Sequence, residues 1–332
     1  MTRRFTALAT LAVALLLTAC GAADQPDSPA QAGQGQGADG ALLSVPQAQQ
    51  GAEQWWNDHE QALLKRDLAA LARLVALPQA GPELELVRAA LATHQGVIAQ
   101  PRQPSAVRVH VPAAQRWPVP VLAVYDVPGS GGARATHVAV LLMKLNPGSA
   151  LVATANATLD AAEPSLDTDA AGYVRMGAPA SQLGTAFATY MEDVVHATPA
   201  PSPAPFAPGK LTSEAGGADA AFLHDPGGHS HGSLSTVDIE YSPVPTASPV
   251  FELAGGAGGF TLVAATRQET LHPLQGQVLN QDAQRRNYGI DLAPGQYQQI
   301  AIASLEVLAV TVPPAGTPAT VVGSGGGVTS EG

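Results

Sequence analysis

Val107-Arg108-Val109-His110-Val111 is the stretch at which the pattern of this chain changes from helical to extended. Valines alternate here with polar residues, and such alternation is typical of a strand with one buried face. Thr236-Val237-Asp238-Ile239-Glu240-Tyr241 repeats the alternation in the second half of the chain. Each of these strands follows a segment with helical periodicity, so the sequence predicts helix and then sheet, twice.

The segment before the first strand predicts a long amphipathic helix. Ser44-Val45-Pro46-Gln47 has the Ser-x-x-Gln form of a capping box, which marks a helix start. The apolar residues behind it recur at helical spacing on one face: Trp56, Leu63, Leu64, Leu68, Leu71, Leu74 and Val75. Charged residues take the other, solvent-facing side: Asp58, Glu60, Lys65, Arg66 and Asp67. Pro78 ends this helix, and residues 83–94 predict a second, shorter one.

The strands are joined by short connections, which indicate an antiparallel meander. In the first half we expect strands at 107–111, 119–127, 137–145 and 151–159. The second half begins with a helix at 183–194, and we expect its strands at 236–241, 250–253, 260–269 and 297–312. The halves differ at one place, where the short turn at Asn146 is replaced by a polar insertion, residues 271–296.

We therefore predict an α+β fold of two tandem repeats, each an N-terminal helix packed on a curved antiparallel four-stranded sheet. The first domain spans residues 42–165 and the second spans 166–323. Residues 324–332 predict a disordered tail, as chain ends of small residues often form. Apolar residues make up 45% of the chain, so each repeat can form a core.

The N-terminus predicts export and lipid attachment. Arg3 and Arg4 precede an apolar run that is too short for a spanning helix, and residues 1–19 are therefore a signal peptide. Leu17-Thr18-Ala19-Cys20 resembles the lipobox of bacterial lipoproteins, which implies that Cys20 carries acyl chains in the mature protein. An ordinary secretory signal with a chance cysteine is the alternative. Residues 20–41 are small and polar, and they predict a flexible tether between the membrane and the folded part.

Composition excludes two classes of function. A net charge of −11 argues against nucleic acid as a partner, because phosphate binding depends on clustered Lys and Arg. The single cysteine is Cys20, so disulfides and thiol chemistry are excluded once it is lipidated.

The layout is similar to a group of actinobacterial lipoproteins of unknown function with a tandem nuclear-transport-factor-2-like or cystatin-like ectodomain. The stretches that carry this resemblance are Trp56 to Leu74 with its Lys65-Arg66-Asp67 turn, Leu-Asp-Thr-Asp-Ala-Ala-Gly-Tyr at 166–173, Phe-Ala-Pro-Gly-Lys-Leu-Thr at 206–212, and Leu-Ala-Val-Thr-Val-Pro-Pro at 308–314. The resemblance implies a tandem α+β ectodomain. It implies no activity, and it supplies no catalytic residues.

One loop has the density of side chains that a metal site needs. His224, Asp225, His229 and His231 lie within eight residues, and neutral imidazole is a ligand for zinc and for copper. The glycines and the proline between them favour a solvated loop instead, and no helix fixes the two close histidines four positions apart. Zinc or copper is therefore one hypothesis for this loop, and no cofactor is the other.

A degenerate active site is a second hypothesis. Asp126 ends a strand, His110 and His137 lie on neighbouring strands, and Tyr125 is adjacent to Asp126. A buried acid in this arrangement would be a candidate proton acceptor. Each residue can also be an outward strand position, and spacing alone does not show that they converge.

Two further features are candidate binding surfaces. Arg285, Arg286 and Tyr288 lie in the polar insertion and form a possible contact surface. Trp55 is expected in the core, and an exposed Trp55 would instead mark a surface for a partner or ligand.

Other motifs carry no chemistry. Asp167-Thr168-Asp169-Ala170-Ala171-Gly172 begins like a calcium loop, but Ala178 stands where the bidentate acid belongs, so a linker is expected. The glycine-rich residues 129–132 predict a hairpin loop, because a strand follows them rather than a helix.

These observations predict a lipid-anchored protein on the extracytoplasmic face of the cell membrane, with a non-enzymatic binding or scaffolding role. Its partners are the membrane, through Cys20, and an unidentified envelope protein or small ligand. A small-molecule or metal-binding lipoprotein is the first alternative, and a degenerate enzyme is the second.

Overall fold

The computed structural model describes residues 40–92, 97–98, 100–129, 134–196, 204–224, 234–244, 248–273, 275–276, 278–280, 296–314 and 316–331. The predicted signal peptide, Cys20 and nearly all of the predicted tether lie outside these residues, as do residues 130–132 of the glycine-rich loop.

The predicted first helix begins where the capping box places it. The Ser44 Oγ accepts a hydrogen bond from the Gln47 amide at 3.3 Å, and the Gln47 Oε1 accepts one from the Ser44 amide at 3.0 Å. The prediction of one helix as far as Val75 is wrong, because the chain turns at Arg66, whose φ of 55° is left-handed. Asp67 then caps a new helix by accepting from the Ala70 amide at 2.9 Å. The helices of the first half are α1 (Val45–Lys65), α2 (Leu68–Leu74) and α3 (Ala80–Ala92).

The strands of the first half form the expected antiparallel meander, with each strand paired to the next one along the chain. Val109 lies opposite Ala123, and Tyr125 lies opposite Val138. The strands are β1 (Ala106–His110), β2 (Val119–Val127), β3 (Thr136–Lys144) and β4 (Leu151–Leu159).

The second half contains the predicted helix and one that the sequence pattern did not predict. Here α4 (Leu183–Val195) is followed by η2 (Lys210–Glu214), a π-helical turn that leads into α5 (Ala215–His224). The strands are β5 (Leu234–Pro243), β6 (Phe251–Glu252), β7 (Gly259–Pro273), β8 (Leu279–Asn280), β9 (Gln296–Tyr297), β10 (Ile300–Val312) and β11 (Thr320–Glu331). A short 3-10 turn, η3 (Ala254–Gly256), connects β6 to β7. Most of the polar insertion lies outside the described residues, except for β8 and the ends of β7 and β9.

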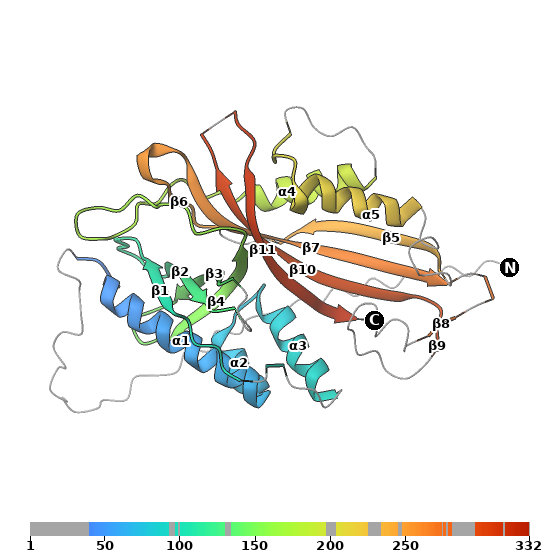
Figure 1. The fold of residues 1–332 in the computed structure, drawn as a ribbon, viewed down its shortest axis with the longest axis horizontal. Helices are drawn as coiled ribbons and strands as arrows, with labels where there is room; N and C mark the ends of the chain where they lie inside the picture. The colour runs from blue at the N-terminus through green and yellow to red at the C-terminus, as the bar shows by residue number, and fades with distance from the viewer. Residues whose placement is uncertain are drawn as a thin grey trace, which may run out of the picture. The chain divides into compact units, whose positions relative to one another are not determined.

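The strands of the two halves join in one mixed α+β architecture with a single large sheet. Within the described residues, nine strands form a sheet of order β1-β2-β3-β4-β11-β10-β7-β5, with β6 paired to β7 (Figure 1). The prediction of two separate four-stranded sheets is therefore wrong. The junction lies between the last strand of each half, where Gly323 of β11 pairs with Leu159 of β4.

The disordered tail predicted for 324–332 is also wrong as far as Glu331, because β11 extends to that residue and pairs along most of its length with β10. The glycines that suggested disorder instead allow β11 to approach its neighbouring strands closely. A Cβ atom on Gly323 would lie 2.4 Å from the Thr158 carbonyl oxygen, so a residue with a side chain would push the two strands apart. Small residues here permit sheet pairing where the composition suggested a frayed end.

Apolar side chains form three layers of core. Trp56 and Tyr125 belong to the cluster between α1–α3 and β1–β4, and Phe187 and Ile239 belong to the cluster between α4–α5 and the later strands. The third cluster lies between the faces of the two parts of the sheet that point away from the helices. Its residues are Leu122, Val124, Ala139, Leu141, Ala155, Ala157, Leu159, Val174, Phe251, Phe260, Leu262, Ala264, Leu305, Val307 and Ala309. The two parts of the sheet thus pack face to face, and the helices lie on the outer sides (Figure 1).

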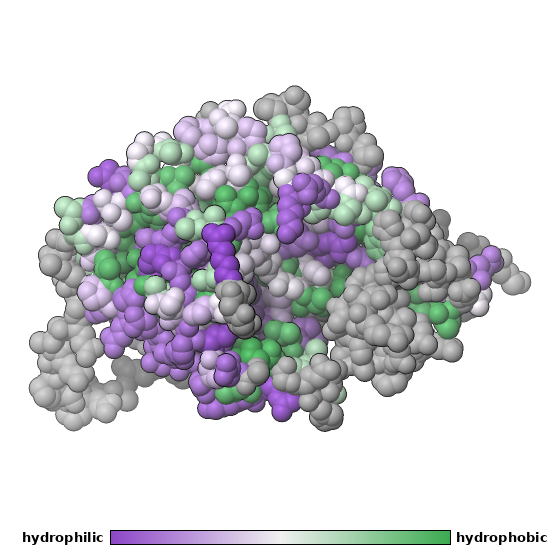
Figure 2. Space-filling model, in the orientation of Figure 1, coloured by the Kyte–Doolittle hydropathy of each residue, from purple (hydrophilic) through white to green (hydrophobic). Residues whose placement is uncertain are grey.

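Apolar surface interrupts the polar surface of α3. Figure 2 shows hydrophilic residues over much of the α1–α3 region, with an apolar patch beside β11. Leu86 is 53% exposed and Leu91 is 40% exposed, and both belong to α3. This part of the surface lies next to a cavity between α1, α3, β4 and β11.

Candidate functional site

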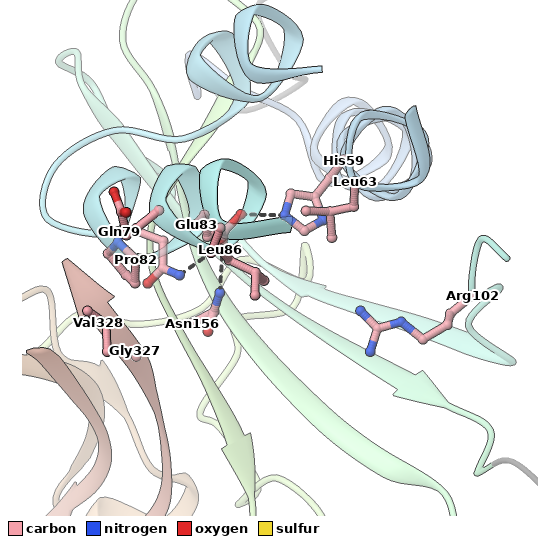
Figure 3. A pocket seen from close by; sticks show the side chains of 13 residues that line it. His59, Leu63, Gln79, Pro82, Glu83, Leu86, Arg102, Asn156, Gly327 and Val328 are labelled. Carbon is pink, nitrogen blue, oxygen red and sulfur yellow. Dashed lines mark hydrogen bonds and ion pairs between the residues drawn. The ribbon is translucent and has the colours of Figure 1, made fainter. Parts of the chain in front are cut away.

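A cavity of about 380 Å³ lies between α1, α3, β4 and β11, and we call it the α1/α3 pocket (Figure 3). His59 reaches it from α1, Glu83 and Leu86 from α3, and Asn156 from β4. The chain that leads into β1 contributes Arg102, and β11 closes one side with Gly327 and Val328. None of these residues was singled out from the sequence as a site.

The carboxylate of Glu83 is the centre of the polar part of this pocket. Its Oε1 accepts hydrogen bonds from the Gln79 Nε2 at 2.9 Å and the Asn156 Nδ2 at 3.0 Å. Its Oε2 lies 2.5 Å from the His59 Nε2. Because an ionised carboxylate only accepts, the His59 Nε2 carries the proton that this contact requires. Two elements, α1 and β4, and the short segment before α3 therefore converge on one buried acid of α3.

The His59 ring is held in place by Trp55. The two rings are stacked, with centroids 4.8 Å apart and planes at 21°. The Trp55 Nε1 donates to the Leu74 carbonyl at 2.8 Å, which ties α1 to α2. Trp55 is only 3% exposed, so the hypothesis of a surface Trp55 that contacts a partner is wrong and its expected place in the core is confirmed.

Glu60 is fully buried, which corrects its expected place on the solvent side of the helix. Its Oε1 accepts from the Arg102 Nη2 at 2.7 Å, and its Oε2 accepts from the Arg102 backbone amide at 2.8 Å. The guanidinium also lies 5.8 Å from the centre of the Trp56 ring, within the range of a cation–π contact. A buried charge persists when it is paired and hydrogen-bonded, and Arg102 supplies both conditions.

Two polar atoms of the residues that line the α1/α3 pocket have no hydrogen-bond partner in the part of the chain that the structure describes. They are the Gln79 Oε1 and the His59 Nδ1. Gln79 is 2% exposed and His59 is 8% exposed, so solvent hardly reaches either side chain. A buried polar atom without a partner costs free energy, and such atoms often mark the place of a ligand or an internal water.

Asp126, the candidate proton acceptor, does lie next to His137. The two side chains belong to an ion-pair network that also includes Arg108. Its carboxylate lies 2.6 Å and 2.8 Å from the Arg108 guanidinium and 2.6 Å from the His137 Nδ1. Hydrogen bonding from Arg108, supported by His137, lowers the pKa of Asp126 to about 2. A carboxylate with so low a pKa is a poor proton acceptor near neutral pH.

The other two candidates of that group are placed differently. His110 contacts Glu163 at 2.9 Å, and Arg108 joins Glu163 to the Asp126 network. The Tyr125 hydroxyl donates to the Ala52 carbonyl at 2.9 Å, on the helix side of β2, and burial raises the pKa of Tyr125. The structure therefore links His110 to Asp126 through two other residues and separates Tyr125 from both.

A second buried network lies under α5. The Arg267 guanidinium holds both carboxylate oxygens of Asp219 at 2.8–2.9 Å and one of Glu269 at 2.8 Å. The Tyr241 hydroxyl donates to Asp219 at 2.9 Å. Burial raises the pKa of the neighbouring Glu306 to about 7; Arg267 opposes this shift, and Asp219 reinforces it. Among the described pockets, one of about 400 Å³ is lined by Tyr241, but none is lined by Asp219, Arg267, Glu269 or Glu306. We therefore assign the network to the packing of α5 on the sheet.

Of the remaining predicted site residues, one is the last described residue before a gap, and the others lie outside the described residues. His224 is the last residue of α5 and is exposed, whereas Asp225, His229 and His231 lie outside the described residues. Arg285, Arg286, Tyr288 and Cys20 also lie outside them. In the residues that are described, no group of three or more His, Cys, Asp or Glu side chains is arranged to hold a metal ion. The zinc or copper hypothesis and the surface at the insertion stay predictions.

Comparison with known protein families, curated proteins and solved structures found no match to this chain. The resemblance to actinobacterial lipoproteins therefore stays a prediction. Among the described residues, no helix is long and apolar enough to cross a membrane.

Proposed function

We propose that this protein is a lipid-anchored, extracytoplasmic binding protein that holds a small molecule in the α1/α3 pocket. The observation that carries the proposal is the pairing of apolar walls with a buried polar end at which Gln79 Oε1 and His59 Nδ1 have no protein partner. Ligand sites combine these two features, because apolar surface supplies affinity and a few polar groups fix orientation. The role is non-enzymatic, and the membrane is reached through lipid on Cys20.

The two halves of the sheet support our further proposal that the fold is a tandem repeat. The four long strands of each half follow one another in space in chain order, β1-β2-β3-β4 and β5-β7-β10-β11, and the halves meet through their last strands. Helices precede the strands in both halves. In this interpretation the first repeat carries the ligand, and the C-terminal strand of the second closes the pocket.

Binding is tested by fluorescence titration of the purified full chain with N-phenyl-1-naphthylamine, an apolar probe whose emission rises on burial. Leu86 lines the pocket and is 53% exposed, and Leu145 lies in the β3–β4 turn and is 52% exposed, so the two leucines make a matched pair. We expect Leu86→Glu to weaken probe binding about tenfold or more, because a charge would stand in the apolar wall. Leu145→Glu should bind like the unchanged protein. Equal binding by both variants, or none by the unchanged protein, would contradict the proposal.

The anchor is tested separately by fractionation of cells that express the chain from its native start. Cys20→Ala should move the protein out of the membrane fraction, because the acyl chains are the proposed attachment. A variant that stays with the membrane would show that lipid on Cys20 is not the anchor. This outcome would leave the pocket proposal intact.

A further inference from the structure

The polar end of the α1/α3 pocket offers acceptors to a ligand. The Gln79 Oε1 is an amide oxygen and accepts only. His59 uses its Nε2–H toward Glu83, so the Nδ1 of the neutral ring is an acceptor as well. Gln79 is 2% exposed and the His59 side chain is 10% exposed, and neither atom has a partner among the described residues. A ligand that satisfies them must bring N–H or O–H groups.

The charges that line the pocket favour a positive head group. Arg102 is neutralised by Glu60, and Glu85 is paired with Arg88 at 3.0 Å. Glu83 has no cationic partner among the described residues unless His59 gains a second proton; its other donors are the neutral amides of Gln79 and Asn156. Glu83 stands in the first turn of α3, where the helix dipole offsets roughly half a charge. The remaining negative potential would repel a carboxylate or a phosphate and attract an ammonium group.

The rest of the lining is suited to hydrocarbon. Leu63, Pro82, Leu86 and Val328 line the pocket from three elements, and the exposed side of Leu86 extends the apolar surface outward. A head group at Gln79 and Glu83 would thus be followed by an apolar body between α1, α3 and β11 (Figure 3). The volume of about 380 Å³ accommodates a ring with a short chain.

We infer that the ligand of the α1/α3 pocket is an amphipathic organic amine. Its protonated amino group donates to the Gln79 Oε1 or the His59 Nδ1 within the field of Glu83, and its apolar part lies against Leu63, Leu86 and Val328. This inference rests on the proposed small-molecule function and adds the chemical class of the ligand.

The test uses three probes of matched shape: 3-phenylpropylamine, 3-phenylpropanol and 3-phenylpropanoate. Each is titrated calorimetrically into the purified full chain, with a blank titration into the same buffer. We expect the amine to bind more tightly than the alcohol, and at least about tenfold more tightly than the carboxylate. Glu83→Gln should remove the advantage of the amine over the alcohol while the alcohol still binds. Glu240→Gln, which removes an exposed charge from β5, should leave all three affinities unchanged.

A second variant protects the test against a folding failure of Glu83→Gln. Gln79→Met removes the unpaired oxygen at similar volume, and it should weaken the amine and the alcohol about fivefold or more. Equal affinities for the three probes, or tightest binding of the carboxylate, would overturn the amine inference and leave the binding proposal standing. Absence of binding by every probe would overturn both.

Discussion

Gly325 of β11 lies so close to Asn156 of β4 that a Cβ atom on the glycine would be 2.2 Å from the Asn156 carbonyl oxygen. The side chain of the same asparagine donates to Glu83 in the α1/α3 pocket. The close approach of β11 to β4 therefore sets the junction between the two halves of the sheet and also the position of one wall of the pocket. A glycine in the C-terminal strand is in this way part of the candidate site.

Gly325→Ala should be strongly destabilising, because real Cβ contacts do not reach 2.2 Å and the strands must separate. We expect a loss of about 3 kcal/mol in the free energy of unfolding, the upper range for overpacking. Urea unfolding of the full chain measures it. Gly217→Ala is the control, because Gly217 is exposed in α5 with nothing within 4 Å of a Cβ atom, and it should be neutral or slightly stabilising. An equal effect of the two changes would contradict the role of Gly325 in strand approach.

His59→Phe should destabilise the protein through Glu83. The substitution keeps an aromatic ring beside Trp55 but leaves the buried Glu83 Oε2 without its donor at 2.5 Å. Loss of a donor to a buried ionised group costs about 3 kcal/mol, because the carboxylate stays buried with one hydrogen bond fewer. Adding Glu83→Gln to His59→Phe should recover part of the loss, because the charge is then gone. A double-mutant cycle by urea unfolding measures this coupling, and purely additive effects would show that the two side chains act independently.

The sequence predicted most helices and strands because their patterns are local. The capping box at Ser44 and the alternation at Val107 depend on neighbouring residues alone, and both elements formed as expected. The break at Arg66 was missed because the apolar spacing continues across it, although Asp67 is a good N-cap residue. The joined sheet was missed because Gly323 acts through a distant strand, and a glycine-rich stretch has no apolar pattern that would indicate a partner.

The candidate site was predictable only in part. His59 and Glu60 lie four positions after Trp55 and Trp56, and this spacing places all four on one face of a helix. That signal was available and would have moved Glu60 from the solvent side to the core. The contact of Glu83 with Asn156 joins residues far apart in the chain, and no local pattern indicates it. The pocket depends on this tertiary packing, so spacing alone did not reveal it.

Asp126→Asn should destabilise the protein near neutral pH. The ion pair with Arg108 lowers the pKa of Asp126 to about 2, from an ordinary value of 3.8, so the ionised form is stabilised by folding. This contribution is present above the ordinary pKa and is lost as the pH falls through about 2. We expect the variant to lose about 1 kcal/mol at pH 7, because water screens part of the interaction, and less at pH 3. Unfolding at both pH values measures it, with the exposed Asp58→Asn as control. If the destabilisation of Asp126→Asn relative to the unchanged protein were larger at pH 3 than at pH 7, the proposed role of the ion pair would be wrong.

Glu306→Gln should make the protein more stable at pH 8 than the unchanged chain, and the advantage should disappear in acid. Burial beside Arg267, Asp219 and Tyr241 raises the pKa of Glu306 from 4.5 to about 7, so folding favours the protonated form. The unchanged protein therefore has this stability in full below pH 4.5 and loses it as the pH rises through about 7. The loss in the free energy of unfolding approaches about 3 kcal/mol above pH 7.

Glutamine cannot ionise, so Glu306→Gln avoids this loss. Urea unfolding at pH 4.5 and pH 8 should therefore show the stabilities of the two proteins diverging as the pH rises. The exposed Glu240→Gln should not change this pH dependence, and a Glu306→Gln variant that parallels the unchanged protein at both pH values would show that Glu306 titrates normally in the fold.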